Sequence, residues 1–226
     1  QVHKKGKITM ANSQRAGYGC RQTMTVGNTP ATGGQSEFLV QPAATTITMQ
    51  KGNPISMQTA AGNGSLGFVM DAAQNTMSDG TTGGVAWTTA LPLIQGVFNG
   101  ATFVDPTGKP TWTNGLAAGQ LTSTDYNTGS ANITAFANTN PNQEYTVRCA
   151  AGPVTNAIFN TGAFNLQDAG VAVNGQSICL LSNGAAVANG MWTVVRGANV
   201  MDQDDFTDVL GGLDVIVTLT KAAAFN

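Results

Sequence analysis

The sequence predicts a mainly β protein with very little helix, built as an antiparallel β-sandwich, a jelly roll or a barrel. The first observation is how often residues that break helices recur. The longest stretch without Gly, Pro, Asn or Asp is the eleven residues 215–225. Helices of average length, about 11–12 residues, therefore have almost nowhere to fit. Strands of about 5–6 residues fit throughout. The second observation is that Asn-Gly and Asp-Gly pairs, which favour tight hairpin turns, recur along the chain.

Short runs rich in β-branched and aromatic residues lie between the turn residues, as expected of strands. The predicted strands are 37–41, 45–50, 55–59, 66–70, 85–90, 93–98, 102–104, 133–137, 144–149, 177–181, 192–196 and 213–220. In the last run, alternate residues from Leu213 to Leu219 are apolar and share one face. Ile216 lies on the opposite face, which predicts burial on both faces there or an interface.

The clearest predicted hairpin is centred on Asn99-Gly100, between Val97-Phe98 and Ala101–Phe103. A type I′ turn needs a positive φ at both central positions, and Asn-Gly tolerates this. Replacing Gly100 with Val should then cost about 1–2 kcal/mol of stability. The polar segment 105–110, which contains Pro106 and Pro110, is predicted to be a stiff loop.

The chain divides into an N-terminal arm, residues 1–34, and a β-rich body, residues 35–226, with a further subdivision near 114–132 as an alternative. The arm is rich in glycine and has no strong strand pattern, so we expect it to be extended and ordered by neighbouring subunits. Its basic side chains are the candidate interaction residues, facing acidic partner surface. They are Lys4, Lys5, Lys7, Arg15 and Arg21.

Composition excludes several classes of function. Charged residues make up 10% of the chain, against about 25% in ordinary soluble domains, so the body is poorly defended against self-association. The single histidine, His3, lies in the N-terminal tail, which argues against a histidine-dependent catalytic triad or a multi-histidine metal site in the core. We therefore expect no enzymatic activity, no catalytic residue and no cofactor.

Two kinds of partner are also not expected. The sequence contains no run of about 18 apolar residues, the length that a membrane-spanning helix needs. Three clustered lysines in the tail supply only a weak electrostatic attraction to phosphates, so we expect no direct contact with nucleic acid.

Three cysteines, Cys20, Cys149 and Cys179, are widely spaced and odd in number, which does not form a disulfide framework. We expect three free thiols that act as small buried apolar groups. Such usage indicates synthesis in a reducing cytoplasm.

Two binding hypotheses remain open beside this. Acidic residues at alternating spacing could share Ca²⁺ in a loop, although the EF-hand glycine and glutamate are missing. These residues are Asp202, Asp204, Asp205 and Asp208. The tryptophans Trp87, Trp112 and Trp192 could form a sugar-binding platform, although aromatic residues of β proteins more often belong to a core or an interface.

Three segments resemble virion structural proteins of marine tailed phages, including cyanophages. The longest is residues 96–111, GVFNGATFVDPTGKPT; the others are residues 11–19, ANSQRAGYG, and residues 140–145, NPNQEY. The resemblance implies a capsid-associated protein: a cement (decoration) protein of the head or another minor head protein. It implies no catalytic residue.

On this resemblance, we expect a non-enzymatic protein that binds the major capsid protein and stabilises the capsid. It would be a homotrimer located in the phage head and made in the host cytoplasm. A closed symmetric assembly would also protect exposed strand edges. The alternative is a surface carbohydrate-binding or adhesive β module, such as a component of a head or tail fibre.

Overall fold

The computed structural model confirms that the chain is mainly β. It describes residues 18–25, 29–30, 34–39, 49–57, 66–67, 94–105, 107–116, 133–150, 158–160, 164–167, 175–177, 179–182, 192–198 and 213–219. These residues form antiparallel sheets, one of them curled into a half-barrel, and no α-helix. A search of the same residues finds no helix with the length and apolarity needed to cross a membrane.

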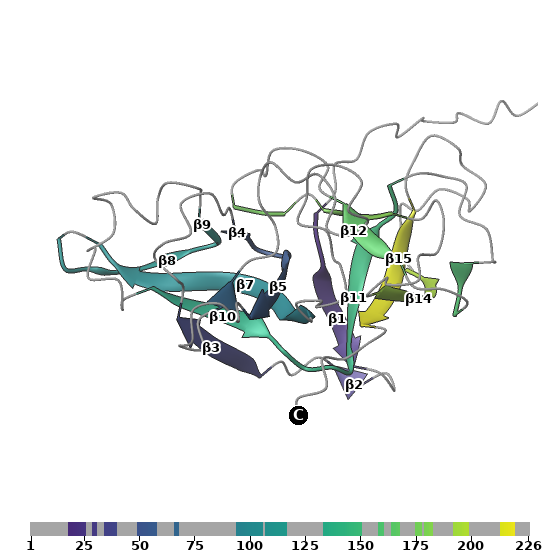
Figure 1. Ribbon diagram of the computed structural model, residues 1–226, viewed down its shortest axis with the longest axis horizontal. Coiled ribbons are helices and arrows are strands. Elements are labelled where there is room, and N and C mark those ends of the chain that lie inside the picture. Colours follow the sequence, from purple (N-terminus) through teal and green to yellow (C-terminus); the bar gives the residue numbers. More distant parts are fainter. Residues whose placement is uncertain are drawn as a thin grey trace, which may run out of the picture.

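The first large sheet, called the β11 sheet, has five antiparallel strands and occupies one side of the molecule (Figure 1). In spatial order its strands are β14 (Trp192–Gly197), β15 (Asp214–Leu219), β11 (Gln143–Arg148), β1 (Arg21–Thr25) and β2 (Thr29–Pro30). Strand β11 lies at its centre, pairing with β15 on one side and with β1 on the other.

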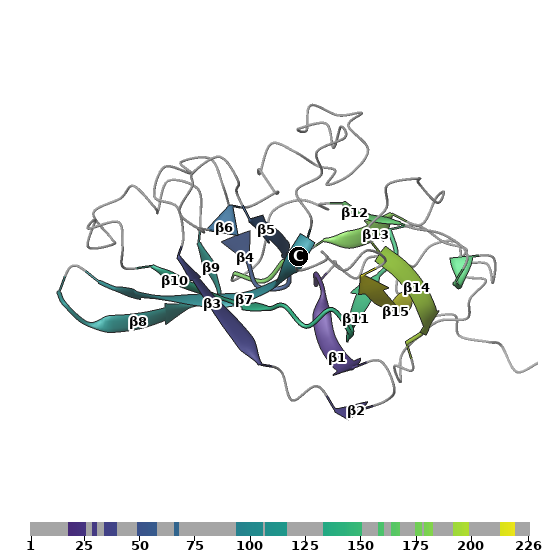
Figure 2. The same ribbon diagram turned by 60° about the horizontal axis from the view of Figure 1, so that its bottom comes forward.

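The second large sheet, called the β7 sheet, lies beside the first (Figure 2). In spatial order its strands are β3 (Gln35–Leu39), β10 (Thr134–Asn138), β7 (Ile94–Val104), β5 (Pro54–Met57) and β6 (Leu66–Gly67). Strand β8 (Pro110–Thr113) pairs with the second half of β7, whereas β5 pairs with its first half. Two small pairs complete the described strands. They are β12 (Asn165–Gln167) with β13 (Leu180–Ser182), and β4 (Met49–Gln50) with β9 (Gly115–Leu116).

Each large sheet buries its own apolar cluster. The cluster under the β11 sheet contains Trp192, Tyr145 and Val217. The cluster under the β7 sheet contains Phe98 and Ile55. Burial of β15 on both faces, predicted from Ile216, is confirmed, because Ile216 is 6% exposed although it faces away from Val215 and Val217.

The predicted hairpin at Asn99-Gly100 is wrong. Strand β7 continues through this pair from Ile94 to Val104. Opposite it, Phe136 pairs with Gly100 and Ala137 pairs with Phe98, so Asn99 is the extra residue of a β-bulge. The true hairpin turn lies at 105–109 and leads into β8, which starts at Pro110 on an edge, where proline is tolerated.

Gly100 is required at the bulge for two physical reasons. Its φ is 137°, a conformation that residues with a side chain rarely adopt. A Cβ atom placed there would also collide with the ring of Trp112, whose atoms Cζ2 and Cε2 are its nearest neighbours. The indole therefore lies directly on the glycine, an arrangement that covers a bare stretch of sheet backbone.

Gly100→Val should lower the free energy of unfolding by at least about 2 kcal/mol, because backbone strain and displacement of Trp112 add together. Urea unfolding measures the loss. In a Trp112→Ala background the same substitution should cost clearly less, since only the strain remains. Equal costs in both backgrounds would mean that Trp112 does not rest on Gly100.

Residues 18–25, which were predicted to belong to an extended arm, are part of the β11 sheet and its core. Strand β1 pairs with β11 through Arg21↔Thr146 and Gln22↔Tyr145, and Cys20 is 5% exposed in the main core. The predicted boundary at residue 34 is therefore wrong for residues 18–25, which fold with the body. Residues 1–17, and with them Lys4, Lys5, Lys7 and Arg15, lie outside the described residues.

Most other predicted strands are found, with shifted ends. The run 133–137 becomes β10 and the run 144–149 becomes β11. Sequence patterns did not predict β1, β2, β8, β9 or β12. The predicted strand 85–90 and most of the alternative boundary 114–132 lie outside the described residues.

Candidate functional site

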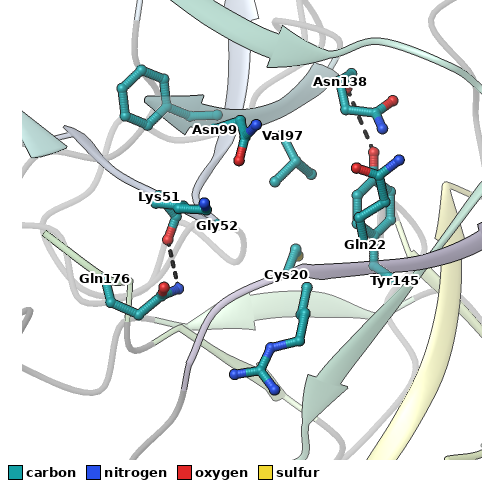
Figure 3. Close-up of a pocket in the computed structure, with 11 residues that line it drawn as sticks. Cys20, Gln22, Lys51, Gly52, Val97, Asn99, Asn138, Tyr145 and Gln176 are labelled. Carbon is teal, nitrogen blue, oxygen red and sulfur yellow. Dashed lines mark hydrogen bonds between the residues drawn. The ribbon is translucent and has the colours of Figure 1, made fainter. Parts of the chain in front are cut away.

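A cavity of about 250 Å³ lies between the two large sheets (Figure 3). Its walls come from the start of β1, the turn after β4, the first half of β7, the end of β10, β11 and residue 176. The described lining residues are Cys20, Arg21, Gln22, Lys51, Gly52, Val97, Phe98, Asn99, Asn138, Tyr145 and Gln176.

The turn at 51–53 holds these walls together through backbone hydrogen bonds. Gly52 donates its N–H to the carbonyl of Phe98 at 2.8 Å and accepts from the N–H of Cys20 at 2.9 Å. The carbonyl of Asn53 accepts from the N–H of Phe98 at 2.8 Å. Gly52 has φ 95°, and Cys20 and Tyr18 pack close to it. The turn thus joins β1 to β7 at a point where only glycine fits without strain.

Carboxamides dominate the polar lining. Gln176 donates through Nε2 to the carbonyls of Tyr18 (2.7 Å) and Lys51 (2.8 Å). Gln22 and Asn138 both donate to Oε1 of the buried Gln143, at 3.1 and 3.4 Å. These bonds fix the orientation of the amides, and Figure 3 shows Asn99, Gln22 and Asn138 around the cavity.

Gln143 is the hub of this amide network. It is 1% exposed, and its Nε2 donates to the carbonyls of Met24 (2.6 Å) and Glu144 (2.8 Å). A buried amide is stabilising only when its hydrogen bonds are made. Gln143 makes bonds to β1 and β10, and so connects the two sheets.

Two ionisable side chains of the cavity, Cys20 and Tyr145, are held neutral by burial, and the lining also includes Arg21 and Lys51. Burial raises the pKa of the Cys20 thiol well above its usual range, and the neighbouring Cys179 adds to the effect. Burial likewise raises the pKa of the Tyr145 hydroxyl. A thiol with a raised pKa is a poor nucleophile. Among the described lining residues none is Asp, Glu or His, and four are carboxamides, namely Gln22, Asn99, Asn138 and Gln176.

The three cysteines are free and buried, as expected. Cys149 also carries a raised pKa, of about 12, because of burial first and the nearby Asp214 second. No described group of three or more His, Cys, Asp or Glu side chains could hold a metal ion.

A buried ion pair lies on the outer face of the β11 sheet. Arg148 Nε donates to Asp214 Oδ1 at 2.8 Å, and the two residues face each other across β11 and β15. Tyr18 hydrogen-bonds to Asp214 as well, and burial followed by this carboxylate raises the pKa of its hydroxyl. The guanidinium groups of Arg21 and Arg148 lie 4.7 and 5.8 Å from the ring centre of Tyr18.

Of the five predicted interaction residues, Arg21 alone lies in the part of the chain that the structure describes. Its cation–π contact with Tyr18 is intramolecular. A second ion pair on the same outer face joins Arg196 to Glu144 through both carboxylate oxygens, with Nη1–Oε1 at 2.9 Å. Glu144 is buried, whereas the side chain of Arg196 is 43% exposed.

The outer face of the β7 sheet forms the second candidate site, called the Trp112 face. Cross-strand pairing puts Trp112, Thr102 and Thr134 in one row, and Gly100, Phe136 and Glu37 in the next. Trp112 is 48% exposed. Its ring centre lies 5.3 Å from that of Phe136 at an interplanar angle of 32°, and its Nε1–H donates to Asn114 Oδ1 at 3.2 Å.

The predicted platform of three tryptophans is wrong as a group. Trp192 is 1% exposed in the core under the β11 sheet, edge-to-face with Tyr145, and Trp112 lies on the other sheet. Trp87 and the acidic residues Asp202, Asp204, Asp205 and Asp208 lie outside the described residues.

Comparison with protein families, with characterised proteins and with solved structures finds no match for this chain.

Proposed function

We propose that the chain is a non-enzymatic structural protein of a phage head, which binds the major capsid protein and stabilises the capsid as a homotrimer. The sequence resemblance in residues 96–111 supports this proposal. So does the inter-sheet cavity, whose described lining offers polar contacts through four carboxamides and includes no Asp, Glu or His.

The observation that carries the proposal is the β7–β8 hairpin. Strand β10 pairs with β7 only up to Thr102, whereas the hairpin continues through Val104↔Pro110 to a turn at the far end of the molecule (Figure 1). A projecting two-stranded element can reach into the junction between neighbouring capsid subunits.

The turn of this hairpin is stiff, which reduces the entropy lost on binding. Asp105 Oδ1 accepts hydrogen bonds from the N–H and hydroxyl of Thr107 (2.9 and 2.6 Å) and from the N–H of Lys109 (2.9 Å). The Thr107 hydroxyl bond is the main cause of a lowered pKa at Asp105, so the carboxylate keeps its charge and its bonds at neutral pH.

The test is sedimentation of the purified full chain with phage capsids that were assembled without it. We expect the full chain to co-sediment and to raise the temperature at which the particles release DNA. Replacing residues 105–109 with a two-residue Asn-Gly turn should weaken particle binding by about tenfold or more, while Met24→Ala, an exposed residue on the other sheet, should leave it unchanged.

Deleting residues 1–17 should also reduce particle binding, as expected of a basic segment that meets acidic partner surface. A full chain that fails to bind or stabilise particles would contradict the proposed function. Binding that survives both the shortened turn and the deletion would place the contact elsewhere.

A further inference from the structure

The indole of Trp112 has one ring face packed on the molecule and a large part of its surface in solvent. Its six-membered ring lies on Gly100, since a Cβ atom there would collide with Cζ2 and Cε2. Phe136 lies beside it at 5.3 Å. The bond from Nε1 to Asn114 fixes its rotation. A half-exposed tryptophan held by three contacts is a preorganised flat surface rather than a mobile side chain.

Several neighbours of this surface are polar and short, while Val104 and Pro110 form the adjacent row of the same face on the side of the turn. Thr102 lies directly across from Trp112 and Thr134 lies next in the same row; both are partly exposed. Asn114, at the end of β8, and Glu37, opposite Phe136 on β3, are exposed. Hydroxyl, amide and carboxylate groups therefore border the aromatic surface on several sides.

The exposed part of the indole is small. A half-exposed tryptophan offers on the order of 100 Å² of surface. An area of this size, with hydrogen-bonding groups at its border, suits a single sugar ring. The C–H groups of a pyranose pack on an aromatic face while its hydroxyls reach the polar border.

Charge narrows the class of sugar. Glu37 is the one charged side chain in the two rows that define the Trp112 face, and it is negative. A carboxylate accepts hydrogen bonds from sugar hydroxyls and repels an acidic sugar. From these observations we infer that the Trp112 face binds a neutral pyranose unit of an oligosaccharide, stacked on Trp112. This site lies on β8 of the hairpin whose turn is the proposed capsid contact, and its test does not require capsid binding.

The test uses the full chain labelled with 5-fluorotryptophan and ¹⁹F NMR, with cellohexaose, mannohexaose and galactohexaose as neutral probes and an oligogalacturonate as the acidic one. At least one neutral probe should shift the Trp112 signal with a dissociation constant of millimolar order or tighter. The signal of the buried Trp192 should not move, and the acidic probe should bind more weakly. Trp112→Phe assigns the Trp112 signal.

Substitutions then separate stacking from fold effects. Trp112→Ala should weaken binding by about tenfold or more. Asn114→Ala should weaken it less, because the indole stays but loses its fixed rotation. Trp112→Phe should retain part of the affinity, which keeps the test valid if the alanine variant fails to fold. Met24→Ala, the matched exposed apolar residue, should have no effect.

Three results would overturn the inference. One is the absence of any shift at Trp112 with all three neutral probes up to about 20 mM, a range that detects even very weak binding. Another is unchanged sugar affinity in the Trp112→Ala variant. The third is a Trp112 signal that shifts with protein concentration in the absence of sugar, which would assign the face to contact between copies of this chain.

Discussion

Asp214→Ala should lower the free energy of unfolding by about 3–5 kcal/mol, because it leaves the charge of Arg148 buried without its partner. The two side chains are only 7% and 8% exposed, and Nε and Oδ1 lie 2.8 Å apart. Tyr18 loses a hydrogen-bond acceptor in the same variant. Urea unfolding, followed by fluorescence, measures the loss.

Two further variants test whether the cost belongs to the buried charge. Replacing both partners, as in Arg148→Met with Asp214→Leu, should recover much of the stability, since apolar pairs of similar volume are often as stable as buried ion pairs. Glu37→Ala, which removes an exposed carboxylate, should change stability by less than about 0.5 kcal/mol. A loss below about 1 kcal/mol in Asp214→Ala would show that water reaches Arg148.

Deleting residues 1–25 should prevent the β11 sheet from folding, whereas deleting residues 1–17 should not. Strand β1 lies between β11 and β2, and pairs with β11 at Arg21, Gln22 and Thr25. Its loss exposes the edge of a strand whose six residues are all buried. It also removes Cys20 from the core and the bond from Gln22 to Gln143.

The measurement is the dispersion of the backbone amide NMR spectrum, with a urea midpoint for each deletion. The shorter deletion should keep the native spectrum of the β11 sheet. For the longer one, adding a synthetic peptide of residues 18–30 should restore it, since the peptide supplies the missing strand. If the longer deletion unfolds at the same urea concentration as the full chain, β1 is not part of the stable sheet.

The fold class was predictable because it depends on local patterns. Frequent helix breakers exclude long helices, and runs of β-branched and aromatic residues between turn residues identified β10, β11 and β15. The Asn99-Gly100 pair could not be assigned, because a hairpin turn and a β-bulge both use a glycine with positive φ. Only the pairing of Phe136 and Ala137 across the sheet distinguishes the two.

Strand β1 and the two candidate sites depended on contacts that no local pattern reports. The sequence RQTMT of β1 has little apolar character. Its Gln22 is instead held by a side-chain hydrogen bond to Gln143, 121 positions away. The cavity likewise brings together carboxamides from strands and loops that lie far apart in the sequence. Trp112 and Trp192 are alike in the sequence, yet one is 48% exposed and the other 1%.

The pairing of β1 with β11 also sets an order of events during synthesis. Ribosomes add about 5–20 residues per second, so β1 leaves the ribosome about 6–24 s before the residues 121 positions later that it must meet. Through that interval its backbone N–H and C=O groups have no sheet to join. The polar composition of RQTMT favours solubility of this early segment until β11 is made. The composition that gives β1 no apolar strand pattern therefore also lowers the tendency of the nascent chain to aggregate.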